Sequence, residues 1–386
     1  MAKTKGLPEA NKYVRLSSDL GRALIDNAHN MYGSENWDPF RFGKRRPSLK
    51  RRLFETVARA GNLLLGPAGI RIVRTRDVGQ EFESFMLNYG EGVADLYGIL
   101  ADEYSRQMLV DVMAYRLLGY ERVKLSTNPL LLEHYRKAQT LMTPDDRIDI
   151  QFLGWKLAKF DLSRIGYPIS VYSVPVGVAS TFIHRDYIYD RITPPIGPSS
   201  GDYVIDAGAA WGDTAVFFAW EVGESGRVFS FEFEPISLGV IQRNLDLNPD
   251  LGKQIEVVPR ALWSKSDLPL PFLCNGPATR VSGCEDPPSD RTVTTVAIDD
   301  FCKDLPRVDF IKMDIEGAEL QALQGAVATI ERHRPRLAIS LYHHLNDFVA
   351  IPRFLSGLNV DYRYYLGHFS IHQEETVLFA TPRMRH

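Results

Sequence analysis

Features that would place this chain in a specialised class are scarce in its 386 residues. The three cysteines, Cys274, Cys284 and Cys302, are odd in number and lack C-x-x-C spacing. They exclude a disulfide framework and a structural zinc site, and they are typical of a reducing cytoplasm. No apolar run approaches the roughly 20 residues of a membrane helix, and the N-terminal MAKTKGLPEANKYVRL has no apolar core for a secretory signal. These absences predict a cytoplasmic protein without a transmembrane segment.

An excess of positive charge is also missing. The formal net charge is −3, whereas a nucleic-acid-binding domain is usually clearly basic, so we expect no nucleic-acid partner. One local exception is RFGKRRPSLKRR at 41–52, with seven positive charges and no negative ones. We interpret it as a solvated, poorly ordered stretch. The alternative is docking onto an anionic surface, such as membrane headgroups, a nucleotide-linked sugar or another phosphorylated substrate.

What the sequence does contain divides it into two parts, 1–165 and 166–386. In the first part, residues 93–118 place apolar side chains near three-to-four spacing, which predicts a helix that ends at Gly119. A further helix is expected over 129–141. We interpret the first part as a mainly helical cap or as an oligomerisation surface for a homo-oligomer.

The second part alternates strands with helices. Strands are expected over 203–208, 227–235, 255–258, 308–315 and 336–342, and helices over 214–222, 236–248 and 317–333. This alternation indicates βαβ units on a parallel sheet. DYRYYLGHFS and ETVLFAT lack room for a helix between them, so they predict a terminal antiparallel hairpin. A mostly parallel sheet that ends in a hairpin is the architecture of Rossmann-like class I methyltransferases.

The loop VIDAGAAWGDTA at 204–215 is the candidate cofactor site, because ligands of an open α/β sheet bind beyond the carboxyl ends of the strands. Gly208 permits a tight turn, and Gly212 lets the next helix pack on the strand. A dinucleotide site would need G-x-G-x-x-G, but Ala210 replaces the middle glycine. Asp206 would repel a pyrophosphate and suits the ammonium or sulfonium group of S-adenosylmethionine. We therefore predict S-adenosylmethionine rather than NAD.

The second strand ends in EFEP at 232–235. A carboxylate at this point can accept hydrogen bonds from the two hydroxyls of a ribose. Glu234 is favoured because it stands at the end of the strand. Glu232 points to the same face and stays an alternative.

Longer motifs connect these features. The chain resembles the FkbM family of S-adenosylmethionine-dependent methyltransferases in five motifs: VIDAGAAWGDTA, FEPISLGVIQRNLDLNP, ALWSKSD, TTVAIDDF and VDFIKMDIEGAELQALQGA. The resemblance covers about 200–330 closely, and DFIKMDIEGAE is its most specific run. It implies methylation mainly of hydroxyl oxygens, commonly on sugars, surface polysaccharides or macrolide-type natural products. Glu232 departs from the family, in which a small residue is usual at this position.

The resemblance also implies which residues form the site. Asp206, Gly208, Gly212 and Glu234 would hold the cofactor, and we add Ala209, Trp211, Asp213 and Pro235 as further expected cofactor residues. Ala261 and Leu262 would line the adenine. Asp314 would lie beside the methyl-transfer centre.

Transfer to an alcohol needs a base that removes the hydroxyl proton. Asp314 and His343 follow neighbouring strands and would form an acid–imidazole pair, in which the histidine suits a general base. His344 and His368 are further candidates. A variant in which Asp314 and His343 bind a divalent metal ranks second, because the sequence lacks a dense acidic ligand cluster. We therefore predict no metal.

These arguments predict an O-methyltransferase with a small-molecule or glycan acceptor. One alternative is N- or C-methylation of a small metabolite. Another is a non-catalytic S-adenosylmethionine-binding module in a polysaccharide assembly. The acceptor would be selected by loops within 265–298 and by the N-terminal part, whose sequences do not identify it.

Overall fold

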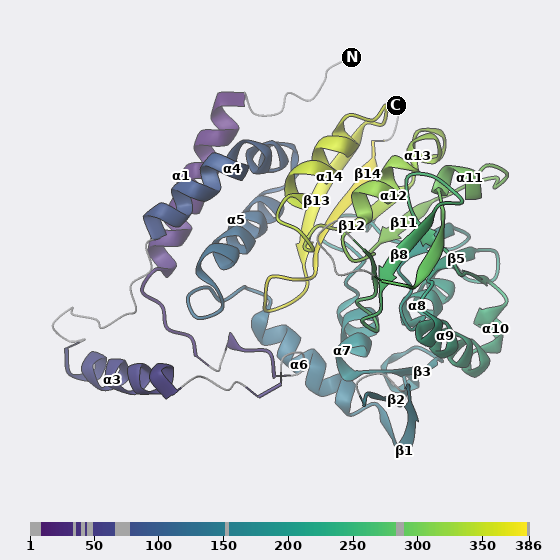
Figure 1. Cartoon of the computed structure of the whole chain (residues 1–386), viewed down its shortest axis with the longest axis horizontal. Helices are drawn as coiled ribbons and strands as arrows, with labels where there is room; N and C mark the ends of the chain where they lie inside the picture. Colours follow the sequence, from purple (N-terminus) through teal and green to yellow (C-terminus); the bar gives the residue numbers. More distant parts are fainter. Residues whose placement is uncertain are drawn as a thin grey trace.

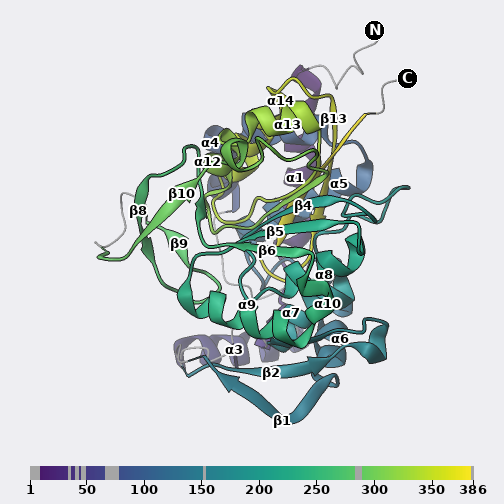
Figure 2. The same cartoon turned by 90° about the vertical axis from the view of Figure 1, so that its right-hand side faces the viewer.

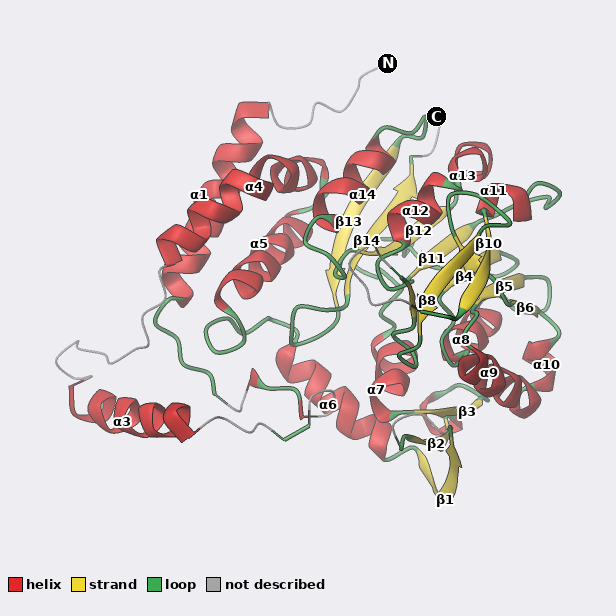
Figure 3. Ribbon diagram, in the orientation of Figure 1, coloured by secondary structure: helices red, strands yellow, loops and turns green. Residues whose placement is uncertain are grey.

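The computed structural model describes residues 9–33, 36–39, 43–44, 49–65, 78–150, 154–282 and 289–383. Helices dominate the N-terminal part and lie to one side of a sheet that the C-terminal part forms (Figures 1 and 3). The predicted fold class is confirmed: a mostly parallel sheet is flanked by helices and ends in an antiparallel hairpin.

The central sheet has seven strands in the order β13-β14-β12-β11-β4-β5-β6. They are β4 (Tyr203–Ala207), β5 (Arg227–Phe231), β6 (Ile255–Val258), β11 (Phe310–Met313), β12 (Arg336–Ser340), β13 (Tyr362–His368) and β14 (Thr376–Pro382). Strands β4, β5, β6, β11 and β12 pair in parallel, whereas β14 pairs antiparallel with β12 and β13. The order along the chain reverses between β4 and β11, which places a ligand crevice at their carboxyl ends.

Helices cover both faces of this sheet (Figure 2). They are α8 (Asp213–Val222), α9 (Pro235–Leu247), α10 (Pro249–Gly252), α11 (Ile298–Phe301), α12 (Glu319–Gln324), α13 (Val327–His333) and α14 (Asp347–Ser356). The single helix expected over 317–333 is wrong, because the chain breaks at Gly325 into α12 and α13. The break is stabilised by Asp299, whose carboxylate accepts backbone N–H groups of the first turn of α13.

The N-terminal part is helical, as predicted. Its helices are α1 (Glu9–Asn27), α3 (Leu49–Leu65), α4 (Val78–Ile99), α5 (Glu103–Leu118) and α6 (Asn128–Gln139). The one helix expected over 93–118 is the end of α4 followed by α5. Asp102 starts α5 by accepting the N–H of Ser105 at 2.7 Å, and Ala101 N–H donates to the carbonyl of Tyr364 in β13. Gly119 ends α5 as expected, with φ 78°.

Helices α1, α4 and α5 share a hydrophobic core with the sheet. Leu16 and Leu20 of α1 and Val112 of α5 belong to the same buried cluster as Ile205 of β4 and Ile311 of β11. Burial of this apolar area stabilises the helices on one face of the sheet. A role of these helices in oligomerisation stays a prediction.

Two smaller sheets flank the central one. The first is antiparallel and consists of β1 (Met142–Asp149), β2 (Lys156–Asp161) and β3 (Ser170–Ser173). The second has the order β7-β10-β8-β9 and consists of β7 (Ala261–Leu262), β8 (Pro269–Leu273), β9 (Arg280–Val281) and β10 (Thr292–Val296). Short helices are η3 (Ser163–Ile165), α7 (Pro175–Val178) and η4 (Ala179–His184). Strands β2 and β3 pair across the expected boundary between residues 165 and 166.

The basic run at 41–52 lies largely outside the described residues. Of its seven cations, Lys44 alone has a described side chain, and it is exposed. Within the described part of the chain, no helix is both long and apolar enough to cross a membrane.

Candidate active site

The turn after β4 is held tightly against β11. Gly208 has φ +81°, and a Cβ at this position would overlap the carbonyl oxygen of Asp314. The N–H groups of Gly208 and Ala209 donate to the carbonyl of Phe231 at 3.0 and 3.1 Å. Gly212 has φ +79° and precedes α8. The two predicted glycines therefore lie where side chains would be strained or would clash.

Asp206 is not exposed to a ligand. Its side chain is fully buried, 3.3 Å from the ammonium group of Lys312, and it accepts hydrogen bonds from Thr214 and Ser230. Lys312 also donates to the carbonyls of Ala207 and Gly208, at 3.0 and 2.6 Å. The charge of Asp206 is balanced inside the protein, so Asp206 is not free to attract a sulfonium group as the sequence predicted. Asp206 and Lys312 instead fix the turn.

Two further predicted cofactor residues face away from the crevice. Trp211 is buried against the β1–β3 sheet, where its ring centroid lies 6.0 Å from that of Trp155. Asp213, in the first turn of α8, is buried within 3.4 Å of the hydroxyl of Ser173, and burial raises its pKa. Both residues are buried on the side of the turn that does not line the pocket.

A pocket that is open to solvent lies at the carboxyl ends of the parallel strands. Its lining includes the turn residues Gly208 and Ala210, the predicted Ala261 and Leu262, and Asp314. The lining also includes Pro277, Thr279 and Val281 of the β8–β9 arm, which lie in the 265–298 segment that the sequence indicated only as a whole.

The acid that lines the pocket after β5 is Glu232. Its carboxylate accepts the N–H groups of Phe233 and Glu234 at 2.7 and 2.8 Å, and burial raises its pKa to about 7. Glu234 is absent from the described pocket lining; it caps α9 by accepting the N–H of Ser237 at 2.7 Å. Pro235 is the first residue of that helix. The structure thus brings the alternative acid, rather than the favoured one, to the pocket.

Asp314 follows β11 at the edge of the pocket. Its carboxylate accepts hydrogen bonds from the hydroxyls of Tyr187 at 2.6 Å and Tyr342 at 2.9 Å. Burial raises the pKa of Asp314, but the charges of His343 and Lys312 and these hydrogen bonds outweigh it and lower the pKa below its ordinary value. Asp314 is therefore ionised at neutral pH.

His343 lies beside Asp314, as their neighbouring strands predict. Its Nε2 is 3.4 Å from oxygens of both Asp314 and Glu316, and its Nδ1 is 3.2 Å from Glu319. Burial lowers the pKa of His343, but contacts with Glu316 and Glu319 and the charge of Asp314 raise it to about 11. An imidazolium has no lone pair for a proton, so in this state His343 does not match the predicted general base.

The other two histidines are placed differently. His344 is exposed, and its backbone N–H donates to Asp347 at the start of α14. His368 is enclosed in the terminal hairpin, where it shares hydrogen bonds with Thr376 and Ser370. Burial lowers the pKa of His368 to about 3 and keeps it neutral. Neither lines the described pocket.

Tyr187 and Tyr342 are site residues that the sequence did not reveal. Tyr187 follows the η4 helix, more than a hundred residues before Asp314, and no spacing rule connects them. Tyr342 is the last residue of the expected strand over 336–342, directly before His343, and this position is the signal that could have pointed to it.

Comparison with known proteins shows what the segment around this site is similar to. Residues 206–364 match the methyltransferase FkbM domain. A curated relative, methyltransferase sdnD of Sordaria araneosa, is 27% identical over 176 residues, which are 37% of this chain and 66% of the relative. The chain thus spans just under two thirds of that relative's length.

A solved structure shows the same fold. The crystal structure of methyltransferase FkbM from Methylobacillus flagellatus KT matches 87% of this chain and 72% of its own, with a TM-score of 0.52 and 20% identity. At this identity the likeness concerns the fold alone. Through residues 206–364, the chain is similar to the methyltransferase FkbM domain.

Proposed function

We propose that this protein transfers a methyl group from S-adenosylmethionine to a hydroxyl oxygen of a sugar, a polysaccharide or a natural product. One observation carries the proposal: in an FkbM domain, the Gly208 turn, Glu232 and the ionised Asp314 line a single pocket at the carboxyl ends of the strands. Ligands of open α/β sheets bind at this place.

The pocket suits S-adenosylmethionine better than a dinucleotide. Glu232 can accept hydrogen bonds from two ribose hydroxyls, and Ala261 and Leu262 offer an apolar surface to adenine. Glu232, Asp314 and Glu316 all line the pocket, and three acids would repel a pyrophosphate. When bound, S-adenosylmethionine supplies an electrophilic methyl carbon on a positively charged sulfur. The negative charge of the acids is compatible with this sulfonium group.

Asp314 is the group that can accept the proton of an alcohol. It is ionised, lines the pocket and is held by the hydroxyls of Tyr187 and Tyr342. These two donors fix the carboxylate, so that it can orient an acceptor hydroxyl for in-line attack. General-base assistance is typically worth about 10²–10⁴-fold in rate. We therefore assign the base to Asp314 and the positive charge beside it to His343.

The acids around the pocket also favour a hydroxylated acceptor. Carboxylates accept hydrogen bonds, and a sugar-like molecule offers several hydroxyl donors. The β8–β9 arm, with Pro277, Thr279 and Val281 on the lining, stands where it can select among such acceptors.

The test uses S-adenosylmethionine labelled with ¹³C at the methyl group, incubated with the protein and extracts of its cells. Carbon NMR distinguishes O–CH₃, N–CH₃ and C–CH₃ by chemical shift, and we expect an O–CH₃ signal that Asp314→Asn abolishes. A product labelled on nitrogen or carbon would refute the oxygen acceptor. Cofactor binding without any labelled product would indicate a non-catalytic module.

A further inference from the structure

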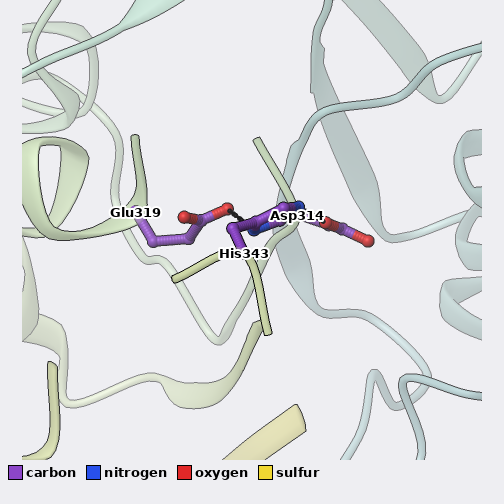
Figure 4. A group of neighbouring side chains, drawn as sticks. All are labelled: Asp314, Glu319 and His343. Carbon is purple, nitrogen blue, oxygen red and sulfur yellow. Dashed lines mark ion pairs between the residues drawn. The ribbon is translucent and has the colours of Figure 1, made fainter. Parts of the chain in front are cut away.

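Two carboxylates and an imidazole converge beside the pocket from three separate elements (Figure 4). Asp314 follows β11, Glu319 begins α12 and His343 follows β12. One ligand atom from each lies within 4.8 Å of the others. Ligands bound at about 2.0–2.2 Å from one metal ion are at most about 4.4 Å apart, so small side-chain shifts would let all three reach a common ion.

Polar atoms in this cluster lack good partners. The fully buried Glu319 uses Oε1 to accept the N–H of Ile315, but its Oε2 has no hydrogen-bond partner among the described residues. The ring of His343 lies between the carboxylates of Glu319 and Asp314 (Figure 4). Its nitrogens are 3.2–3.4 Å from carboxylate oxygens and make no hydrogen bond of good geometry within the described structure. Charged hydrogen bonds are normally about 2.7–2.9 Å long.

The cluster also has a surplus of negative charge. Asp314, Glu316 and Glu319 surround one imidazole, and among the described residues no lysine or arginine forms an ion pair with them. The charge of the buried Lys312 acts on Asp314, but its ion pair is with Asp206. Burying unpaired charge is costly, so this site favours a cation.

We propose that Asp314, Glu319 and His343 bind a divalent metal ion, which would replace the imidazolium proton of His343 because a ligating histidine is neutral. Two carboxylates and one imidazole suit Mn²⁺, which accepts oxygen and nitrogen ligands and leaves coordination positions for water or an acceptor. Asp314 also lines the pocket, so such an ion would face the acceptor. A hydroxyl bound to it would lose its proton more easily. This role rests on the proposed methyl transfer, whereas binding of the ion does not.

The test is an electron paramagnetic resonance titration of the full chain with Mn²⁺. We expect one bound ion per chain, and at least about tenfold weaker binding in Glu319→Gln and His343→Gln. Glu224→Gln, an exposed acid in the turn before β5, is the matched control and should bind as the wild type does. The proposal would be overturned if the wild type bound no Mn²⁺, or if the wild type and the three variants bound Mn²⁺ with equal affinity.

A second measurement needs no variant. Pulsed resonance of the wild-type Mn²⁺ complex should show coupling to an imidazole nitrogen, and its absence would overturn the assignment of His343. Methyl transfer that proceeds unchanged after chelation would refute the role of the ion in the reaction and leave the proposed function standing. Mn²⁺ binding without cofactor binding would support the site and refute the function.

Discussion

The two halves of the site differ in how their buried charge is balanced. Around the turn after β4, the one fully buried acid, Asp206, is matched by Lys312 and two hydroxyl groups. Around the ends of β11 and β12, three acids share one imidazole. In the balanced half, Asp206 and Lys312 hold a backbone turn in place. In the unbalanced half, the excess negative charge lies beside the position where a reacting group would bind.

The largest effect is expected from Lys312→Met, which tests the balanced half. Removing the lysine leaves Asp206 buried without its cation, and breaking a buried pair costs about 3–5 kcal/mol. Urea unfolding should show this loss, and Asp206→Asn in the same chain should restore part of it. Lys253→Met, which breaks an exposed pair with Asp250, should leave stability unchanged. Equal stability of wild type and Lys312→Met would contradict the account.

Gly208→Ala tests whether the turn after β4 binds the cofactor. A left-handed backbone costs an alanine about 1–2 kcal/mol, and its Cβ would also overlap the carbonyl of Asp314. Calorimetry should show that S-adenosylmethionine binding is lost, together with reduced stability. The control is Gly239→Ala on α9, where a Cβ meets nothing within 4 Å. If Gly208→Ala bound S-adenosylmethionine as tightly as the wild type does, the cofactor would not bind at this turn.

The variants Glu232→Gln and Glu234→Gln test which of the two acids after β5 binds the cofactor. Glu232 lines the pocket, and hydrogen bonds to a charged group are worth about 1.5–3 kcal/mol, which corresponds to roughly 10–100-fold in Kd. Glu234→Gln should leave Kd unchanged and cost about 0.3–1 kcal/mol of stability, because it removes a charge from the start of α9. The reverse pattern would restore the assignment that the sequence favoured.

The smallest effect is the pH dependence of cofactor binding. Burial raises the pKa of Glu232 to about 7 from the ordinary 4.5, so the acid becomes neutral as the pH falls through 7 and accepts ribose hydroxyls less well. Affinity should therefore fall below pH 7 in the wild type and stay flat in Glu232→Gln. The same shift favours the protonated folded state, so its contribution to stability is present below pH 4.5 and lost as the pH rises to 7. A wild-type profile as flat as that of the variant would remove Glu232 from the site.

Local patterns predicted the sheet well because they report on burial along one element. The strands β4, β5 and β11 and the hairpin β13–β14 follow from apolar runs and their spacing. The breaks in the expected helices do not, because they depend on distant partners: Tyr364 holds the chain before α5, and Asp299 starts α13.

The site shows the same limit. Gly208 and Asp314 could be identified because each follows a strand whose end faces the crevice. The choice between Glu232 and Glu234 depended on which of them caps α9, and the role of Asp206 depended on Lys312, which comes from another strand. The sequence also gave no sign that Glu319 joins Asp314 and His343, because this requires the start of α12 to fold back over the ends of β11 and β12.

The most direct test of the central claim is calorimetry of the full chain with S-adenosylmethionine, S-adenosylhomocysteine and NAD. We expect both sulfur compounds to bind at one site per chain, Glu232→Gln to weaken both, and NAD not to bind. Tight binding of NAD with no binding of S-adenosylmethionine would contradict the account.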